Sequence, residues 1–171
     1  MTGGIVWLTG IPAAGKSTIA KALQKNLLAR GTRAEILDGD EIRKHLSPDL
    51  DFTREGRERQ AARVAHVALM LARNGVWALV ALVSPYASSR ARAREDAAAQ
   101  GSPFVEVHVK CSLESARRRD PKGLYKKAAA GDLADLTGTS APYEEPAFPE
   151  VVVETDTTPL AACVDLIMTK G

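Results

Sequence analysis

The chain has 171 residues, of which 45% are hydrophobic and 26% charged, and its formal net charge is +2. This length fits one domain that buries roughly 70% of the surface of its unfolded chain, so the fold needs no disulfide or metal to hold it together. Because the net charge is close to neutral, bulk charge attracts neither nucleic acid nor an anionic membrane, and any recognition of anions must be local.

The two cysteines and the start of the chain indicate a cytoplasmic protein. Cys111 and Cys163 lie far apart and neither belongs to a C-x-x-C pair, which favours reduced thiols over a disulfide framework or a zinc site. A strand pattern begins at Ile5, so no basic region, apolar leader and cleavage site precede it. The apolar run 76–83 is too short to cross a bilayer, and we expect no membrane partner.

Apolar runs alternate with helical patterns along the whole chain. Short runs rich in Val, Ile and Leu predict strands, and longer patterns with Gly31, Gly75 and Gly101 as stops predict helices. This alternation is typical of an α/β fold, a parallel sheet with helices on both faces, whose ligands collect at the carboxyl ends of the strands. The predicted strands are 5–9, 34–37, 76–83, 104–109 and 151–154, and the predicted helices are 16–30, 54–73, 88–100, 113–118 and 160–168.

The phosphate-binding motif G-x-x-x-x-G-K-[ST] follows the first predicted strand and opens the first predicted helix. Glycines let backbone amides in such a loop turn toward phosphate oxygens, and the helix start adds partial positive charge. We expect Lys16 to reach the β- and γ-phosphates of ATP and Ser17 to hold Mg²⁺; the alternative is a glycine-rich turn that only caps the strand. The motif is Gly10, Ile11, Pro12, Ala13, Ala14, Gly15, Lys16 and Ser17, and Thr18 continues the predicted ATP-binding segment.

Polar residues follow the second and third predicted strands. Asp38, Asp40 and Arg43 follow the second, where a carboxylate can hold Mg²⁺ or take a proton from an attacking hydroxyl, and an arginine can clamp an anion. Asp40 is the preferred base or metal partner, although either aspartate could instead only cap the next helix. The third strand ends without an acidic residue, at Ser84 and Pro85.

Two basic clusters could reach the same edge of the sheet. Residues 54–63 carry four arginines on a predicted helix, and 117–127 is a basic segment in which Pro121 and Gly123 indicate a loop. A basic loop that closes over a triphosphate would neutralise charge and exclude water. The alternative for both clusters is a solvated basic face.

Taken together, these segments resemble the adenylylsulfate kinases. The likeness covers residues 5 to about 150 and rests on the phosphate loop, 38–43, Phe52 with the arginine-rich helix, 84–86, 119–128 and 137–144, of which 119–128 is the most diagnostic. The resemblance implies a single phosphate-loop kinase domain over 1–171 with a lid at about 119–145. It implies that ATP, with Mg²⁺, phosphorylates the 3′-hydroxyl of adenosine 5′-phosphosulfate (APS) to 3′-phosphoadenosine 5′-phosphosulfate (PAPS), and that the protein is a homodimer.

The resemblance also implies roles for individual residues. Asp40 lies near the accepting hydroxyl and the metal, Arg43 and Arg57 grip the phosphosulfate, and Phe52 lies beside the acceptor adenine. Ser84 matches a serine considered in a phosphorylated form in some members, but direct in-line transfer needs only positioning and charge neutralisation. The implied catalytic residues are Lys16, Asp40 and Ser84, the metal ligands Ser17 and Asp40, a further ATP contact Arg117, and the acceptor-binding residues Asp38, Asp40, Arg43, Phe52, Arg57, Gln60, Ser84, Pro85, Tyr86, Lys122, Gly123, Leu124 and Leu136.

The chain departs from the family pattern on the acceptor side. Leu136 stands where the family usually has an aromatic residue, 60–63 reads Gln-Ala-Ala-Arg instead of Asn-Ile-Arg-Arg, and Ala65 and His66 replace a Gly-Glu pair. A missing ring would cost about 1 kcal/mol of stacking. Two alternatives therefore stay open: a kinase for another nucleotide-linked acceptor, and a regulatory module that binds ATP without turnover.

Overall fold

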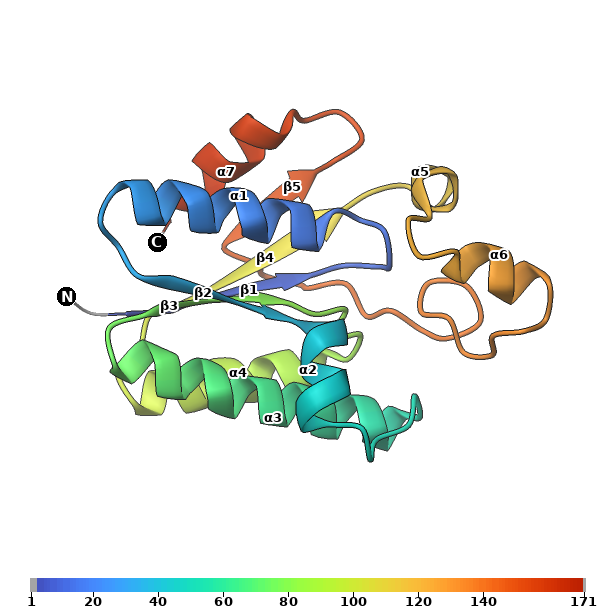
Figure 1. Ribbon diagram of the computed structural model, residues 1–171, viewed down its shortest axis with the longest axis horizontal. Helices are drawn as coiled ribbons and strands as arrows, with labels where there is room; N and C mark the ends of the chain where they lie inside the picture. Colours follow the sequence, from blue (N-terminus) through green and yellow to red (C-terminus); the bar gives the residue numbers. More distant parts are fainter. Residues whose placement is uncertain (1–2, 171) are drawn as a thin grey trace.

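The computed structural model describes residues 3–170 and contains one parallel sheet in the order β2-β3-β1-β4-β5 (Figure 1). Its strands confirm the predicted fold class. They are β1 (Ile5–Thr9), β2 (Ala34–Asp38), β3 (Trp77–Ala81), β4 (Phe104–Lys110) and β5 (Val151–Glu154).

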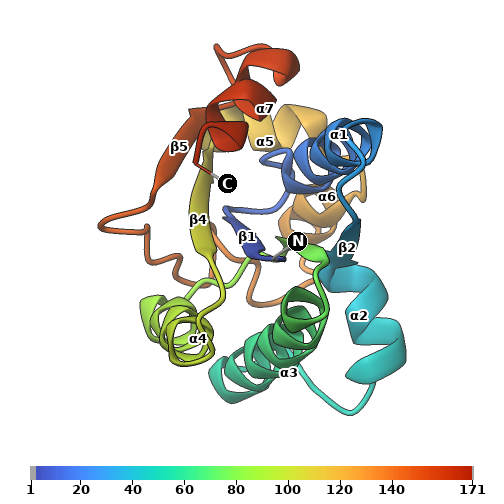
Figure 2. The same ribbon diagram turned by 90° about the vertical axis from the view of Figure 1, so that its left-hand side faces the viewer.

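Helices cover both faces of this sheet, with α1 and α7 on one side and α3 and α4 on the other (Figure 2). All five residues of β1 are buried, because both faces of the strand are covered. Val6 and Leu8 pack into the core on the α1 side, whereas Ile5 and Trp7 pack into the core under α3. The helices are α1 (Lys16–Ala29), α2 (Gly39–Leu46), α3 (Arg54–Arg73), α4 (Ala87–Ala99), α5 (Leu113–Arg119), α6 (Leu124–Ala129) and α7 (Leu160–Met168).

Most element ends lie within one residue of the sequence prediction, and the predicted glycine stops are confirmed. Gly31, Gly75 and Gly101 have φ values of 75°, 73° and 64°, in the left-handed region that glycine adopts at little cost. The strand predicted at 76–83 is wrong at its end, since β3 stops at Ala81. The chain then turns away from the sheet, and Ser84 has a φ of 38°.

The sequence prediction missed two short helices. α2 has no buried residue, and its start is fixed by the Asp38 side chain, which accepts a hydrogen bond from the Asp40 amide. α6 begins after Gly123, which has a left-handed φ of 66°, so the segment predicted as a loop is a turn followed by a helix. Both helices are short, at eight and six residues, so each spans too few turns for apolar residues at helical spacing, such as Ile42 and Leu46 in α2, to stand out in the sequence.

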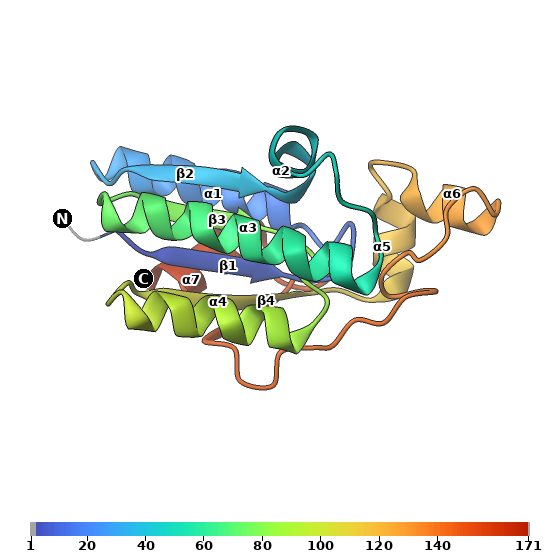
Figure 3. The same cartoon turned by 90° about the horizontal axis from the view of Figure 1, so that it is seen from below.

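The segment that contains α5 and α6 lies beyond the carboxyl ends of the strands (Figure 3). It has a small core of its own, in which Tyr125 and Leu136 pack with Ala116. The Tyr125 hydroxyl donates a hydrogen bond to the Pro12 carbonyl at 2.8 Å, which ties this segment to the loop after β1. Within residues 3–170, no helix combines the length and apolar character needed to cross a membrane.

The packing of α1 gives a test of the core. Leu23 is 1% exposed, so Leu23→Ala should lower the free energy of unfolding by about 2–5 kcal/mol because it leaves a cavity under the helix. Leu28 on the same helix is 54% exposed, so Leu28→Ala should change it by less than about 0.5 kcal/mol. Urea denaturation measures both, and equal losses would contradict the assignment of the buried face.

Candidate active site

A cavity of about 410 Å³ lies where the carboxyl ends of β1, β2 and β3 meet the segment containing α5 and α6. Its position is the one expected for a ligand of a parallel sheet. The walls come from the phosphate loop, α2, the start of α3, the turn after β3 and the α5–α6 turn. The lining residues are Pro12, Ala13, Gly15, Lys16, Ser17, Thr18, Asp38, Gly39, Asp40, Arg43, Phe52, Arg57, Gln60, Ala81, Leu82, Val83, Ser84, Pro85, Arg119, Asp120, Pro121, Lys122 and Leu124.

The phosphate loop has the backbone that its glycines allow. A side chain on Gly10 would meet the Val109 carbonyl oxygen at 2.3 Å, so only glycine fits there. Gly15 has a φ of 108° and directly precedes α1, whose first turn has no side-chain cap. The free amides of this first turn can therefore bind an anion.

Lys16 folds back over the loop. Its Nζ donates hydrogen bonds of 2.8 Å to the carbonyls of Gly10 and Ile11, and its side chain is buried. Burial, with the nearby charge of Lys122, lowers the pKa of Lys16 to about 8. An anion such as a phosphate would compensate this charge.

Ser17 and Asp38 form a pair of oxygen ligands at the cavity wall. Ser17 Oγ donates to Asp38 Oδ2 at 2.6 Å, while Asp38 Oδ1 accepts from the Asp40 amide at 3.0 Å. Burial would raise the pKa of Asp38, but these hydrogen bonds outweigh it and the pKa lies below its usual value. Asp38 therefore caps α2. Its ionised carboxylate, beside the Ser17 hydroxyl, is also suited to bind Mg²⁺.

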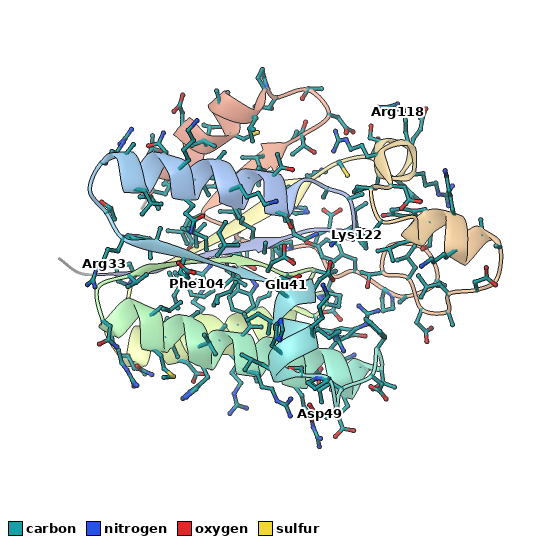
Figure 4. The ribbon with its side chains drawn as sticks, in the orientation of Figure 1. Arg33, Glu41, Asp49, Phe104, Arg118 and Lys122 are labelled. Atoms are coloured by element: carbon teal, nitrogen blue, oxygen red, sulfur yellow. The ribbon has the colours of Figure 1, made fainter. Side chains whose placement is uncertain are left out.

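Asp40, the predicted metal ligand, instead contacts Lys122 from the α5–α6 turn. Both side chains are more than half exposed, at 57% for Asp40 and 55% for Lys122, so each is free to reorient. Lys122 lies between this turn and the sheet, whereas Arg118 lies on the outer side of α5 (Figure 4). The contact brings a cation of the predicted lid to the carboxylate predicted to act on the acceptor.

Phe52, Arg43 and Arg57 form the opposite wall. The guanidinium carbons of Arg43 and Arg57 lie 4.3 Å and 5.6 Å from the Phe52 ring centroid. Phe52 is 56% exposed, so it is not a core residue and much of its ring is accessible. Arg57 also donates to Thr137 Oγ1 at 2.9 Å and to the Asp135 carbonyl at 2.8 Å.

Gln60 and Ser84 lie at the buried end of the cavity. Gln60 donates to the Gly39 carbonyl at 3.3 Å, and its Oε1 atom has no hydrogen-bond partner in the part of the chain that the structure describes. Ser84 Oγ accepts from Trp7 Nε1 at 2.9 Å and donates to the Leu82 carbonyl at 3.3 Å. Because its hydroxyl both accepts and donates a hydrogen bond within the protein, Ser84 is a fixed part of the cavity wall.

Seven predicted site residues do not line the cavity. Gly10, Ile11 and Ala14 belong to the phosphate loop but lie outside the lining, although the carbonyls of Gly10 and Ile11 accept the hydrogen bonds from Lys16. Tyr86 is buried beneath the Arg54 guanidinium, Leu136 lies in the small core beside Tyr125, and Gly123 caps α6. Arg117 is exposed on α5. Of the arginines at 54–63 only Arg57 reaches the cavity, since the other three pair with Glu58, Glu55 and Asp49.

Arg119, which the sequence analysis did not single out, reaches the cavity where Arg117 does not. It donates to Thr155 Oγ1 and to the Thr155 carbonyl, both at 2.9 Å, and to Asp156 at 3.2 Å. Thr155 Oγ1 in turn donates to the Ala14 carbonyl at 2.8 Å. The run of three arginines at 117–119 indicated a basic segment near the site. The sequence alone does not show which of the three side chains faces the cavity.

The chain is similar to proteins of one family over nearly all its length. A family model described as adenylylsulphate kinase matches residues 2–154. The adenylyl-sulfate kinase of Myxococcus xanthus is 53% identical over 90% of this chain and 83% of its own length, and the probable adenylyl-sulfate kinase of Aeropyrum pernix is 49% identical over 90% and 84%.

Solved structures give the same result. The APS kinase of Mycobacterium tuberculosis, in complex with AMPPNP and APS, superposes with a TM-score of 0.92 at 39% identity and covers 98% of both chains. The family match and the fold agree with the cavity built around the phosphate loop. The chain therefore belongs to the adenylylsulfate kinase family.

Proposed function

We propose that this chain transfers the γ-phosphoryl group of ATP to the 3′-hydroxyl of APS and releases ADP and PAPS. The observation that carries the proposal is that Lys16 of the phosphate loop, Asp40 and Phe52 all line one cavity. Phosphoryl transfer needs this arrangement, because catalysis depends on positioning two substrates and neutralising charge.

The donor would bind with its phosphates over the uncapped start of α1. Lys16 would exchange its loop carbonyls for the β- and γ-phosphates, and Arg119 and Thr155 lie beside the loop at the expected edge of the donor site. Ser17 and Asp38 are the residues that would hold Mg²⁺, which when bound neutralises charge on the phosphates. Exchange of carbonyls for phosphate oxygens keeps the buried ammonium group hydrogen-bonded throughout.

The acceptor would bind against the Phe52 wall. The accessible ring face suits the APS adenine, and the guanidinium groups of Arg43 and Arg57 suit its phosphosulfate. Gln60 Oε1 is a buried acceptor atom ready for a donor group of the substrate. Asp40 would take the proton of the 3′-hydroxyl, and Lys122 would move from Asp40 to the transferring phosphate as the lid closes.

The two alternatives have little support in this geometry. Leu136 and Ala62, the substitutions that suggested another acceptor, lie in the lid core and on the exposed side of α3, and neither lines the cavity. The regulatory alternative requires a degraded transfer site, yet Lys16, Asp40 and Lys122 all line one cavity. The homodimer implied by the resemblance stays a prediction, which sedimentation velocity would test.

The activity itself is tested with purified protein, ATP, Mg²⁺ and APS. PAPS and ADP should form in equal amounts, as measured by chromatography of the nucleotides. A panel of other nucleotide-linked acceptors serves as the control. Faster phosphorylation of another acceptor, or ATP binding without product, would overturn the proposal.

Removal of the Asp40 carboxylate should abolish most of this transfer. Asp40→Asn should lower kcat by about 10²–10⁴-fold, since the amide cannot take the hydroxyl proton. Asp49→Asn is the matched control, because Asp49 pairs with Arg63 and lies on the outer side, away from Lys122 (Figure 4). Equal kcat values for the two variants would exclude Asp40 as the base.

Loss of the Phe52 ring should weaken the acceptor alone. Phe52→Ala should raise the KM for APS by about 5- to 150-fold, which corresponds to the 1–3 kcal/mol of a base stacked on an aromatic ring. The KM for ATP should not change. Phe148, which is 91% exposed and lies outside the cavity, provides the control variant Phe148→Ala. An unchanged KM for APS in Phe52→Ala would remove the ring from the acceptor site.

The lowered pKa of Lys16 predicts proton uptake on ATP binding. Above a pH of about 8 the free protein holds Lys16 largely neutral, and the phosphates restore its charge, so binding between about pH 8 and 10 should take up as much as one proton. Below that pH Lys16 is protonated before and after binding. Titration calorimetry in buffers of different ionisation enthalpy measures the uptake. Lys16→Met should remove it and Lys44→Met should not, since Lys44 is exposed on α2; equal uptake in both would contradict the assignment.

A further inference from the structure

Arg90 is a buried arginine in the interior, outside the cavity described above. It lies on α4 and is 2% exposed. Its guanidinium makes three hydrogen bonds in three directions: Nε to Glu106 Oε1 of β4 at 2.8 Å, Nη1 to the Ser84 carbonyl at 2.6 Å and Nη2 to the Glu144 carbonyl at 2.6 Å. One group thus connects a helix, a strand, the turn after β3 and the segment that leaves the lid.

The Ser84 turn that Arg90 holds is part of the cavity wall. Ser84 and Pro85 line the cavity, and Ser84 has a φ of 38°, a left-handed conformation that costs free energy for a residue other than glycine. Such a conformation persists only where its surroundings fix it. The hydrogen bonds from Arg90 to the Ser84 carbonyl and from Trp7 to the Ser84 hydroxyl supply that restraint.

The segment that leaves the lid is clamped to the same turn. The Glu144 amide donates to the Pro85 carbonyl at 2.8 Å, and the Ala87 amide donates to Glu144 Oε2 at 2.7 Å. One residue earlier, the Tyr143 hydroxyl lies 3.1 Å from Thr9 Oγ1 of β1. In Figure 3 this segment passes α4 on its way from the lid to β5. The lid can therefore move only on the α6 side of Tyr143.

The charges around Arg90 show why an arginine is needed there. Glu106 is shared with Arg94, which also pairs with Glu150, so two cations face two carboxylates and their charges balance. Arg90 and Glu106 are largely buried, whereas Arg94 and Glu150 are about one-third exposed. A buried ion pair contributes little net stability by itself. What arginine provides at this position is a planar guanidinium group with several N–H donors. A lysine ammonium group in the same place could not reach three separate acceptors.

We propose that Arg90 is a positioning residue, which fixes the turn at Ser84 and Pro85, at the buried end of the cavity, and the Glu144 end of the lid as one rigid unit. The proposal rests on the proposed function, since it assigns the turn to the acceptor side. It predicts that loss of the guanidinium group raises the KM for APS more than the KM for ATP. It also predicts that the lid moves between an anchor at Arg119 and an anchor at Glu144.

The kinetic test compares Arg90→Lys with Arg94→Lys. Both variants keep the charge and both disturb the bonds to Glu106, but only Arg90 touches Ser84 and Glu144. Arg90→Lys should raise the KM for APS by about tenfold or more, while the KM for ATP stays within about twofold. Arg94→Lys should leave both within about twofold. Equal effects of the two variants, or equal rises in both KM values, would reduce Arg90 to a structural ion pair and overturn the proposal.

Hydrogen exchange tests the same proposal without substrate. In the wild type the amides of Ala87 and Glu144 should exchange more slowly than those of 132–142, and Arg90→Lys should speed both by about tenfold or more while Arg94→Lys does not. If Arg90→Lys fails to fold, the wild-type pattern decides: exchange at Glu144 as fast as in the lid would overturn the anchor. A wild type that forms no PAPS yet shows this protection would contradict the proposed function and leave the anchor standing.

Discussion

The phosphate loop can turn back over the end of β1 only because Gly10 lies against the backbone of β4, where a side chain would meet the Val109 carbonyl. The carbonyl groups of the loop then accept hydrogen bonds from other residues around the site. Lys16 donates to Gly10 and Ile11, Tyr125 of the lid to Pro12, and Thr155 after β5 to Ala14. With these acceptors engaged by Lys16 of the loop itself and by two other parts of the chain, the amides at the start of α1 stay available for an anion.

The same arrangement explains how a nearly neutral chain recognises two highly charged nucleotides. Five cations, Lys16, Arg43, Arg57, Arg119 and Lys122, line one cavity that has Asp38, Asp40 and Asp120 as its carboxylates. Lys16 and Lys122 lie close enough for repulsion to lower the pKa of Lys16. A bound triphosphate would offset that repulsion.

The sequence was sufficient to predict those features that one physical constraint determines. Strands buried on both faces had to be continuous apolar runs, and the phosphate loop had to have glycine at Gly10 and Gly15. The sequence was insufficient where the role of a residue depends on the direction in which its side chain points. Asp40 was the preferred metal partner in the sequence, yet the cap of α2 turns Asp38 toward Ser17, and Asp40 contacts Lys122. Helices as short as α2 and α6 span too few turns for apolar residues at helical spacing to be recognised in the sequence.

The placement of Leu136 changes how the departures from the family pattern should be understood. Arg57 of the acceptor wall bonds to the Asp135 carbonyl and to the Thr137 hydroxyl, on either side of Leu136. The Leu136 side chain itself packs with Tyr125, and Tyr125 bonds to the phosphate loop. The wall formed by Phe52, Arg43 and Arg57 is thus joined to the segment after α6 through backbone and hydroxyl groups that do not depend on the residue at 136. Replacement of an aromatic residue by leucine therefore alters the packing of the lid on the phosphate loop, while the contacts of Arg57 are kept.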